Sequence, residues 1–110
     1  MTQPPEVPDV SLHEFQQQIE RIYYERDAAR GVDRTFVWLT EEIGELARSL
    51  LSGEPASPAE QAEFADCLAW LSTLASLRGV NLATAAWEKY GDGCPRCKQT
   101  PCDCQHRSGA

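Results

Sequence analysis

The chain has 110 residues, a formal net charge of −7 and five cysteines. A chain of this length forms one domain, and its acidity disfavours general binding to nucleic acids or anionic membranes, which both attract basic surfaces. An odd number of cysteines is not typical of a secreted disulfide framework. Residues 1–10 lack the apolar run of a signal peptide, and Leu68–Leu77, the longest nearly apolar stretch, is too short to span a membrane. We therefore expect a soluble cytoplasmic protein.

Residues 1–10 contain three prolines and predict a disordered lead. Ser11 and Glu14 form the pattern of a capping box, in which a serine and a glutamate three residues later satisfy exposed backbone N–H groups. A first helix is therefore expected to start here and to end near Gly31. Its apolar residues recur at helical spacing: Leu12, Phe15, Ile19, Ile22 and Tyr23.

A second helix is predicted from about Arg34 to Ser52. Asp33 has the side chain of a helix N-cap, and Gly53 is a natural stop. The helix carries an apolar stripe that we expect to face the core: Phe36, Leu39, Ile43, Leu46 and Leu50.

Three start signals stand together at the beginning of the third predicted helix. They are Ser57 as N-cap, Pro58 at the first helical position and Glu60 in the first turn. The helix should end at Gly79. Its lining is apolar: Phe64, Cys67, Leu68, Leu71, Leu74 and Leu77.

Asn81 is expected to cap a fourth, shorter helix that runs to about Tyr90 and is closed by Gly91. Trp87 is expected on the side of this helix that faces the core. No segment alternates as a strand does, so the predicted fold class is all-α. The short link at 54–57 requires helices two and three to form an antiparallel hairpin. Because one copy offers little core, we expect the bundle of residues 11–91 to be completed by oligomerisation, as a homodimer or homotetramer.

Two acidic pairs are the most informative feature of the chain. Glu42 and Glu45 are three residues apart on the second helix, as are Glu63 and Asp66 on the third, so each pair shares a helix face. The predicted hairpin places the two faces opposite each other. Carboxylates without nearby histidine or cysteine ligands suit Mg²⁺ or Mn²⁺. The alternative is an ordinary solvated face.

Arginines and tryptophans lie close to these pairs in the sequence. Arg26 and Arg30 are four apart near the end of the first helix and are suited to phosphate. The alternative is that both simply favour the helix C-terminus or pair with Asp27 and Glu25. Trp38 and Trp70 flank the acidic residues at helical spacing. They are candidates for stacking on a base or, alternatively, for packing in the core or at a subunit interface.

Three sequence stretches resemble the MazG-type nucleotide pyrophosphohydrolases of the all-α nucleotide-triphosphatase superfamily. They are EEIGEL at 41–46, EFADCLAWL at 63–71 and the later GVNL…KYG at 79–91, and the resemblance covers roughly 11–91. The superfamily also contains dimeric dUTPases, dCTPases and phosphoribosyl-ATP pyrophosphohydrolases. The resemblance implies a four-helix MazG-like bundle.

The resemblance also implies an activity: hydrolysis of a nucleoside triphosphate between the α and β phosphates, giving the monophosphate and pyrophosphate. Glu41 would orient water or ligand beside the metal or, equally, is only solvated, and Lys89 would contact substrate. Family members often have an asparagine shortly after that lysine, where this chain has Asp92 and Gly93, so contacts to base and sugar stay unassigned. The implied Mg²⁺ ligands are Glu42, Glu45, Glu63 and Asp66.

Residues 92–110, here called the cysteine tail, contain the pattern C-x₂-C-x₄-C-x-C. Four thiolates can enclose one tetrahedral Zn²⁺, and a site with four protein ligands is structural. The alternatives are redox-active thiols or a disordered cysteine-rich end. His106 is a spare candidate ligand. The four expected zinc ligands are Cys94, Cys97, Cys102 and Cys104.

The main hypothesis is thus a Mg²⁺-dependent nucleoside triphosphate pyrophosphohydrolase that removes unwanted nucleotides. A non-catalytic helical module that binds nucleotide or a protein partner is the alternative, and phosphoribosyl-ATP hydrolysis is a third possibility within the same superfamily.

Overall fold

A computed structural model describes residues 8–105. Most of the predicted disordered lead and His106 therefore lie outside the described residues. The described part contains four helices and no strand, which confirms the all-α prediction. None of these helices is long and apolar enough to cross a membrane. The helices are α1 (Leu12–Arg30), α2 (Val32–Ser52), α3 (Pro58–Leu77) and α4 (Leu82–Tyr90).

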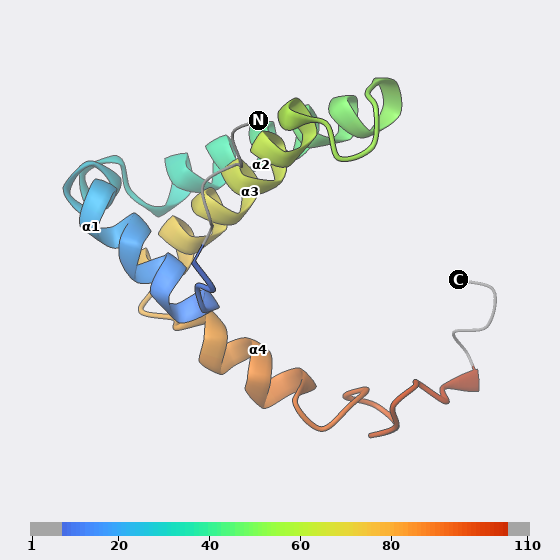
Figure 1. The fold of residues 1–110 in the computed structure, drawn as a ribbon. Coiled ribbons are helices and arrows are strands. Elements are labelled where there is room, and N and C mark those ends of the chain that lie inside the picture. Colours follow the sequence, from blue (N-terminus) through green and yellow to red (C-terminus); the bar gives the residue numbers. More distant parts are fainter. Residues whose placement is uncertain (1–7, 106–110) are drawn as a thin grey trace.

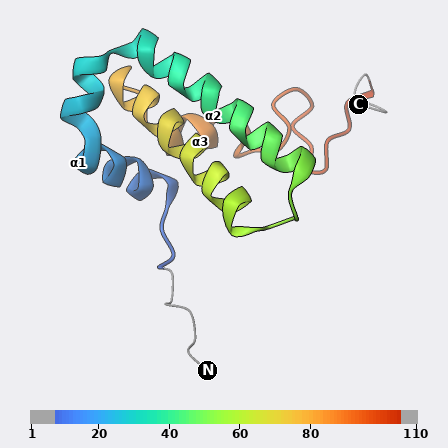
Figure 2. The same ribbon diagram turned by 90° about the horizontal axis from the view of Figure 1, so that it is seen from above.

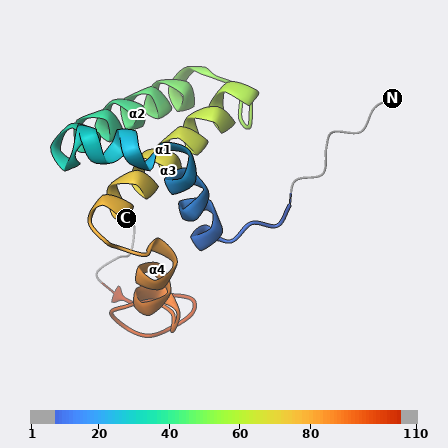
Figure 3. The same ribbon diagram turned by 90° about the vertical axis from the view of Figure 1, so that its left-hand side faces the viewer.

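The helices α2 and α3 form the predicted antiparallel hairpin, and α1 packs across it (Figure 1). Seen from above, α2 and α3 run side by side along most of their length (Figure 2). The helix α4 leaves the hairpin and touches α1, and the cysteine tail follows beyond it (Figure 3). The hairpin and α1 thus hold the candidate catalytic residues, while the four cysteines of the tail lie elsewhere.

The predicted helix starts at Ser11, Ser57 and Asn81 are confirmed. The hydroxyl of Ser11 accepts a hydrogen bond from the Glu14 N–H at 3.0 Å, and the Glu14 carboxylate accepts one from the Ser11 N–H at 3.1 Å. The side chains of Ser57 and Asn81 each accept a backbone N–H at 3.1 Å. These contacts satisfy N–H groups that would otherwise lack partners at a helix start.

Asp33 is not the cap of α2, contrary to the prediction. Gly31 alone separates α1 from α2, and its φ of +87° is a conformation that glycine adopts without strain. The chain therefore turns at one residue, and Asp33 already lies in the first turn of α2. No side chain caps this start; instead the Thr35 hydroxyl donates to the Gly31 carbonyl at 2.7 Å.

A buried glutamine ties α1 to the start of α4. The Nε2 of Gln16 donates to the Val80 carbonyl at 2.8 Å and to the Ser76 hydroxyl at 3.0 Å, and its Oε1 accepts from the Leu82 N–H at 2.9 Å. Because every polar atom of this buried side chain is paired, its burial is not penalised. The buried apolar residues of the described chain are few: Ile19, Leu39 and Ala75.

Much of the predicted apolar stripe of α2 is exposed in the single chain. Leu39 is buried, but Phe36, Ile43 and Leu50 are each about half exposed. Trp87, predicted to be in the core, is 74% exposed, so that prediction is wrong. The reason is that α1 and α3 cover only one side of α2, and α4 contacts mainly α1 rather than the hairpin. One copy therefore leaves a large apolar surface uncovered.

Candidate functional site

Three carboxylates meet between α2 and α3. One oxygen each of Glu42, Glu45 and Glu63 lies within 4.8 Å of the other two. The Oε2 atoms of Glu42 and Glu63 are buried and accept no hydrogen bond in the described structure. A buried oxygen without a donor is costly, so this pair of atoms calls for a positively charged partner.

The charges in this cluster act on one another. The pKa of Glu42 is raised, first because the carboxylate is partly removed from water and then because Asp66, Glu45 and Glu63 repel its negative charge. Asp66, predicted as the fourth ligand, is exposed and is not part of the close group of three, but it is near enough to influence Glu42. The structure therefore brings three predicted ligands together and leaves the fourth at their edge.

The donor set of this cluster fits a hard divalent cation. All three groups offer carboxylate oxygens, and the ion pair seen among residues 8–105 joins Arg30 to Asp27, outside this cluster. Oxygen ligands of this kind suit Mg²⁺ or Mn²⁺ better than softer metals. The two buried oxygens of Glu42 and Glu63 are the atoms that such an ion would satisfy.

A pocket of about 220 Å³ lies next to the cluster, between α1 and α3. Four predicted site residues line it: Arg26, Arg30, Asp66 and Trp70. Asp66 is therefore placed between the carboxylates and a pocket that contains both arginines. A wall with two guanidinium groups suits a phosphate group, because arginine can donate two parallel hydrogen bonds to its oxygens.

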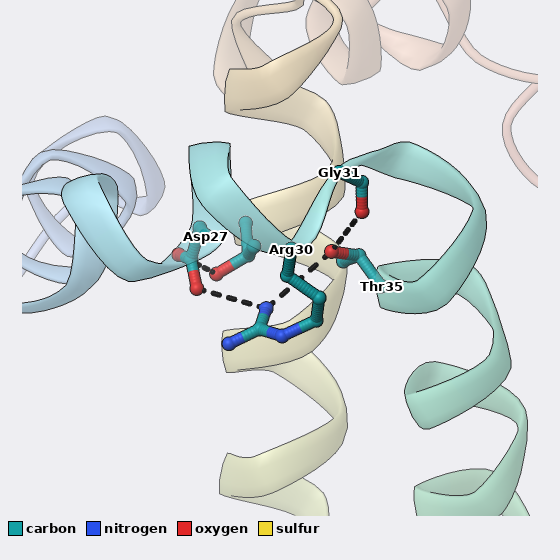
Figure 4. Close-up of polar contacts among 5 residues, drawn as sticks. Asp27, Arg30, Gly31 and Thr35 are labelled. Carbon is teal, nitrogen blue, oxygen red and sulfur yellow. Dashed lines mark hydrogen bonds and ion pairs between the residues drawn. The ribbon is translucent and has the colours of Figure 1, made fainter.

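Arg30 is fixed by polar contacts that Figure 4 shows. Its Nη1 donates to Asp27 Oδ1 at 3.0 Å and lies 3.4 Å from the Thr35 hydroxyl (Figure 4). The other oxygen of Asp27 accepts a hydrogen bond from the Thr73 hydroxyl of α3 at 2.9 Å. Asp27 is only 4% exposed. The pairing of Arg30 with Asp27 is thus present, and it leaves Arg30 within the pocket.

The supporting roles of Thr35 and Thr73 were not predicted from the sequence. Thr73 lies 46 residues from Asp27, and nothing local to either residue indicates that they meet. The only signal was a threonine within the apolar run of α3, where a hydroxyl requires a partner when it is buried.

The two tryptophans stack on each other. The ring centres of Trp38 and Trp70 are 6.2 Å apart and their planes differ by 18°. The guanidinium carbon of Arg30 lies 4.8 Å from the centre of the Trp70 ring, within the range of a cation–π contact. Trp38 is still 47% exposed. Together with Glu41 it lines a shallow cavity that Arg30 shares.

Lys89 is not in the pocket that contains Asp66. It lies on α4 with its Nζ 5.7 Å from the ring centre of Tyr90, and it lines a cavity of about 610 Å³ formed with the cysteine tail. Asn81 caps α4, as expected, and its side-chain nitrogen is 3.0 Å from His13 Nδ1. A single chain thus does not unite Lys89 with the acidic residues.

The four cysteines of the tail form a second cluster. Their sulfur atoms all lie within 4.8 Å of one another. Backbone N–H groups of Cys97 and Arg96 lower the pKa of the Cys94 thiol to about 6, whereas the neighbouring Cys102 raises that of Cys104 to about 12. This group can hold a metal ion. The fifth cysteine, Cys67 on α3, is partly buried and lies apart from it.

No protein-family model matches the chain, and no curated protein is similar to it in sequence. Inference about function therefore rests on the residues and on the geometry of the two clusters.

Proposed function

We propose that the protein is a Mg²⁺-dependent nucleoside triphosphate pyrophosphohydrolase that cleaves between the α and β phosphates. The observation that carries this proposal is the group of Glu42, Glu45 and Glu63, with two buried oxygens that lack hydrogen-bond donors. It lies beside a pocket lined by two arginines. The carboxylates would bind a divalent cation, and the arginines beside them would bind an anionic phosphate chain.

Glu42, Glu45 and Glu63 would hold Mg²⁺ (or Mn²⁺), and Asp66 would contribute from the pocket side. When bound, the ion neutralises charge that develops on phosphate oxygens and lowers the pKa of water. Exposed Glu41, on the same helix, is available to accept a hydrogen bond from a water molecule at the edge of the site.

The two arginines would have different roles in binding phosphate. Arg26 would contact the phosphate chain directly. Arg30 is held by Asp27 and by the face of Trp70, so it would keep its position when substrate binds. A preorganised cation stabilises developing charge without first having to reorganise. The exposed side of Trp38 would stack on the base.

The pocket is small for a whole nucleotide. Ligand sites usually occupy about 300–1,000 Å³, whereas this pocket has about 220 Å³ and accommodates part of the ligand. We propose that a second copy covers the exposed apolar side of α2 and completes the site in a homodimer or homotetramer. The half exposure of Phe36, Ile43 and Leu50 supports this assembly. Lys89 would then reach the substrate from another subunit.

A non-catalytic nucleotide-binding module is the second candidate. The observation that favours it is the placement of Lys89 outside the acidic pocket of the same chain. Phosphoribosyl-ATP, which is also cleaved between its α and β phosphates, is an alternative substrate of the same chemistry.

A substrate panel tests the proposal. Purified protein is mixed with canonical and damaged nucleoside triphosphates and phosphoribosyl-ATP, with Mg²⁺ or Mn²⁺, and released pyrophosphate is measured. We expect Glu42→Gln and Asp66→Asn to lose at least about 100-fold in rate. Even residues that only hydrogen-bond to the ligands of a metal typically contribute about 10–100-fold. Glu88→Gln is the matched control, since Glu88 is exposed on α4. Nucleotide binding without pyrophosphate release from any member of the panel would favour the binding module.

A further inference from the structure

We propose that Cys94, Cys97, Cys102 and Cys104 hold one Zn²⁺ in a closed tetrahedral site that orders the chain beyond α4. This site is separate from the carboxylate cluster and does not depend on the proposed hydrolase activity. Three features support this site: the sulfur geometry, the surrounding backbone, and the absence of buried residues from the described part of the tail, 92–105.

The sulfur–sulfur distances match a single small ion. Zn–S bonds of about 2.3 Å in a regular tetrahedron separate the sulfur atoms by about 3.8 Å. The pair Cys94–Cys104 is 3.7 Å apart and the pair Cys97–Cys102 is 4.0 Å apart. These pairs share no atom, so they form opposite edges of the tetrahedron. Thiolates bound to the separate irons of an iron–sulfur cluster would lie further apart.

The backbone is folded around this point. The Asp103 N–H donates to Cys97 Sγ at 3.3 Å, and the Cys104 N–H donates to Cys102 Sγ at 3.4 Å. Donors aimed at sulfur favour the thiolate, which is the form that binds metal. Two backbone hydrogen bonds close the first turn: Lys98 N–H to the Cys94 carbonyl at 2.7 Å, and Cys94 N–H to the Gln99 carbonyl at 3.0 Å.

Burial of side chains contributes little to the stability of residues 92–105. None of the residues at 92–105 is fully buried, yet the backbone includes a positive φ at both Gly93 and Lys98. A short segment without a hydrophobic core does not hold such turns by burial alone. In small metal domains the free energy of metal binding supplies the free energy of folding. Soft thiolate ligands in tetrahedral arrangement select Zn²⁺.

The site is structural rather than catalytic. Four protein ligands occupy all four positions of tetrahedral zinc and leave none for water or substrate. The ion would therefore fix the tail against the end of α4, where Lys89 and Tyr90 share a cavity with Pro95 and Thr100. Loss of zinc should disturb the tail and leave α1 and the hairpin folded.

The full-length chain, purified without a polyhistidine tag, allows a direct test. Metal analysis should find about one zinc per chain. Replacement by Co²⁺ should give the visible bands of tetrahedral cobalt and the ultraviolet band of thiolate-to-cobalt charge transfer. The double variant Cys97→Ser/Cys102→Ser should lose zinc and both bands. Cys67→Ser, which removes the cysteine outside the cluster, should keep them.

Two results would overturn the proposal. One is zinc retained at full stoichiometry by the double variant, and the other is cobalt bound by the unaltered protein without a thiolate band. Glu42→Gln separates the two sites: it should keep zinc and the cobalt spectrum, and its loss of zinc would assign the ion to the carboxylates instead. Far-UV circular dichroism checks that the variants keep their helices. Because none of these readouts measures hydrolysis, failure of the zinc proposal is distinct from failure of the proposed activity.

Discussion

The Glu42→Gln substitution is expected to have opposite effects on stability with and without Mg²⁺. In the metal-free protein Glu42 is repelled by Asp66 and also by Glu45 and Glu63, which each offer an oxygen within 4.8 Å of one of its own. Glutamine removes that repulsion while keeping nearly the same shape. In the presence of Mg²⁺ the same change removes a ligand, so it should abolish most of the stabilisation that metal binding provides.

The size of the first effect follows from Coulomb's law. At 4.8 Å, the upper limit of these separations, two unit charges repel by about 0.9 kcal/mol in water and by about 3.5 kcal/mol at an effective dielectric constant of 20. Because Glu45 is exposed, the value in water is the better guide. Two such neighbours predict that metal-free Glu42→Gln is more stable by about 1–2 kcal/mol.

The second effect follows from linkage. A ligand at about 100 times its dissociation constant stabilises the folded state by about 2.7 kcal/mol. Urea unfolding in the same metal-depleted buffer, then in a Mg²⁺ series, measures both effects, and any contribution of the cysteine tail cancels between variants. The stability curves of the two proteins should cross as Mg²⁺ rises. Glu88→Gln should follow the unaltered protein throughout. A variant that is destabilised without metal, or that gains as much from Mg²⁺ as the unaltered protein, would refute the reasoning.

Three further predictions concern pH, the support of Arg30 and the cysteine tail. The pKa of Glu42 is raised in the folded state, so the folded protein binds this proton more tightly than the unfolded chain does. The stability of the metal-free protein should therefore fall as the pH rises from the ordinary glutamate range through the raised pKa. Urea titrations of Glu42→Gln should show no such contribution. Asp27→Asn weakens the buried contacts to Arg30 and Thr73 and should cost about 1–3 kcal/mol in urea unfolding, whereas an unchanged midpoint would show that these contacts contribute little. Gly93→Ala should lower the affinity for zinc, because an added Cβ would lie 2.8 Å from the Thr100 hydroxyl and because Gly93 has a φ of +102°. Competition with a chromophoric chelator measures this affinity, and an unchanged value would contradict the close approach.

The parts of the fold that were predictable from sequence are those fixed by local interactions. Caps such as Ser11 and Ser57 act on N–H groups within three residues, so their effect is visible in the sequence itself. Asp33 had the right residue type but the wrong place, because Gly31 serves as the end of one helix and the start of the next. An apolar stripe identifies a helix face, but it does not tell what covers that face, and Trp87 was misassigned to the core for this reason.

The candidate site was predictable to the same extent. Spacing of three residues put each acidic pair on one face, and the short link after α2 brought the faces together, so Glu42, Glu45 and Glu63 meet. Asp66 lies further out, because one helical turn moves it towards α1 and the arginine pocket. The support of Arg30 through Asp27 and Thr73 depends on packing between α1 and α3, which no local pattern records.

The two clusters differ in ligand type, and this difference would allow each to select its own metal. Thiolates bind Zn²⁺ in preference to Mg²⁺, whereas exposed and half-buried carboxylates suit the harder ion. The cysteines lie beyond α4, on a segment that does not pack against the hairpin (Figure 3). A chain with four thiolates in one place would therefore take up scarce zinc there first. The carboxylates of α2 and α3 would then be free to bind Mg²⁺, which is the ion usually bound to nucleotide phosphates.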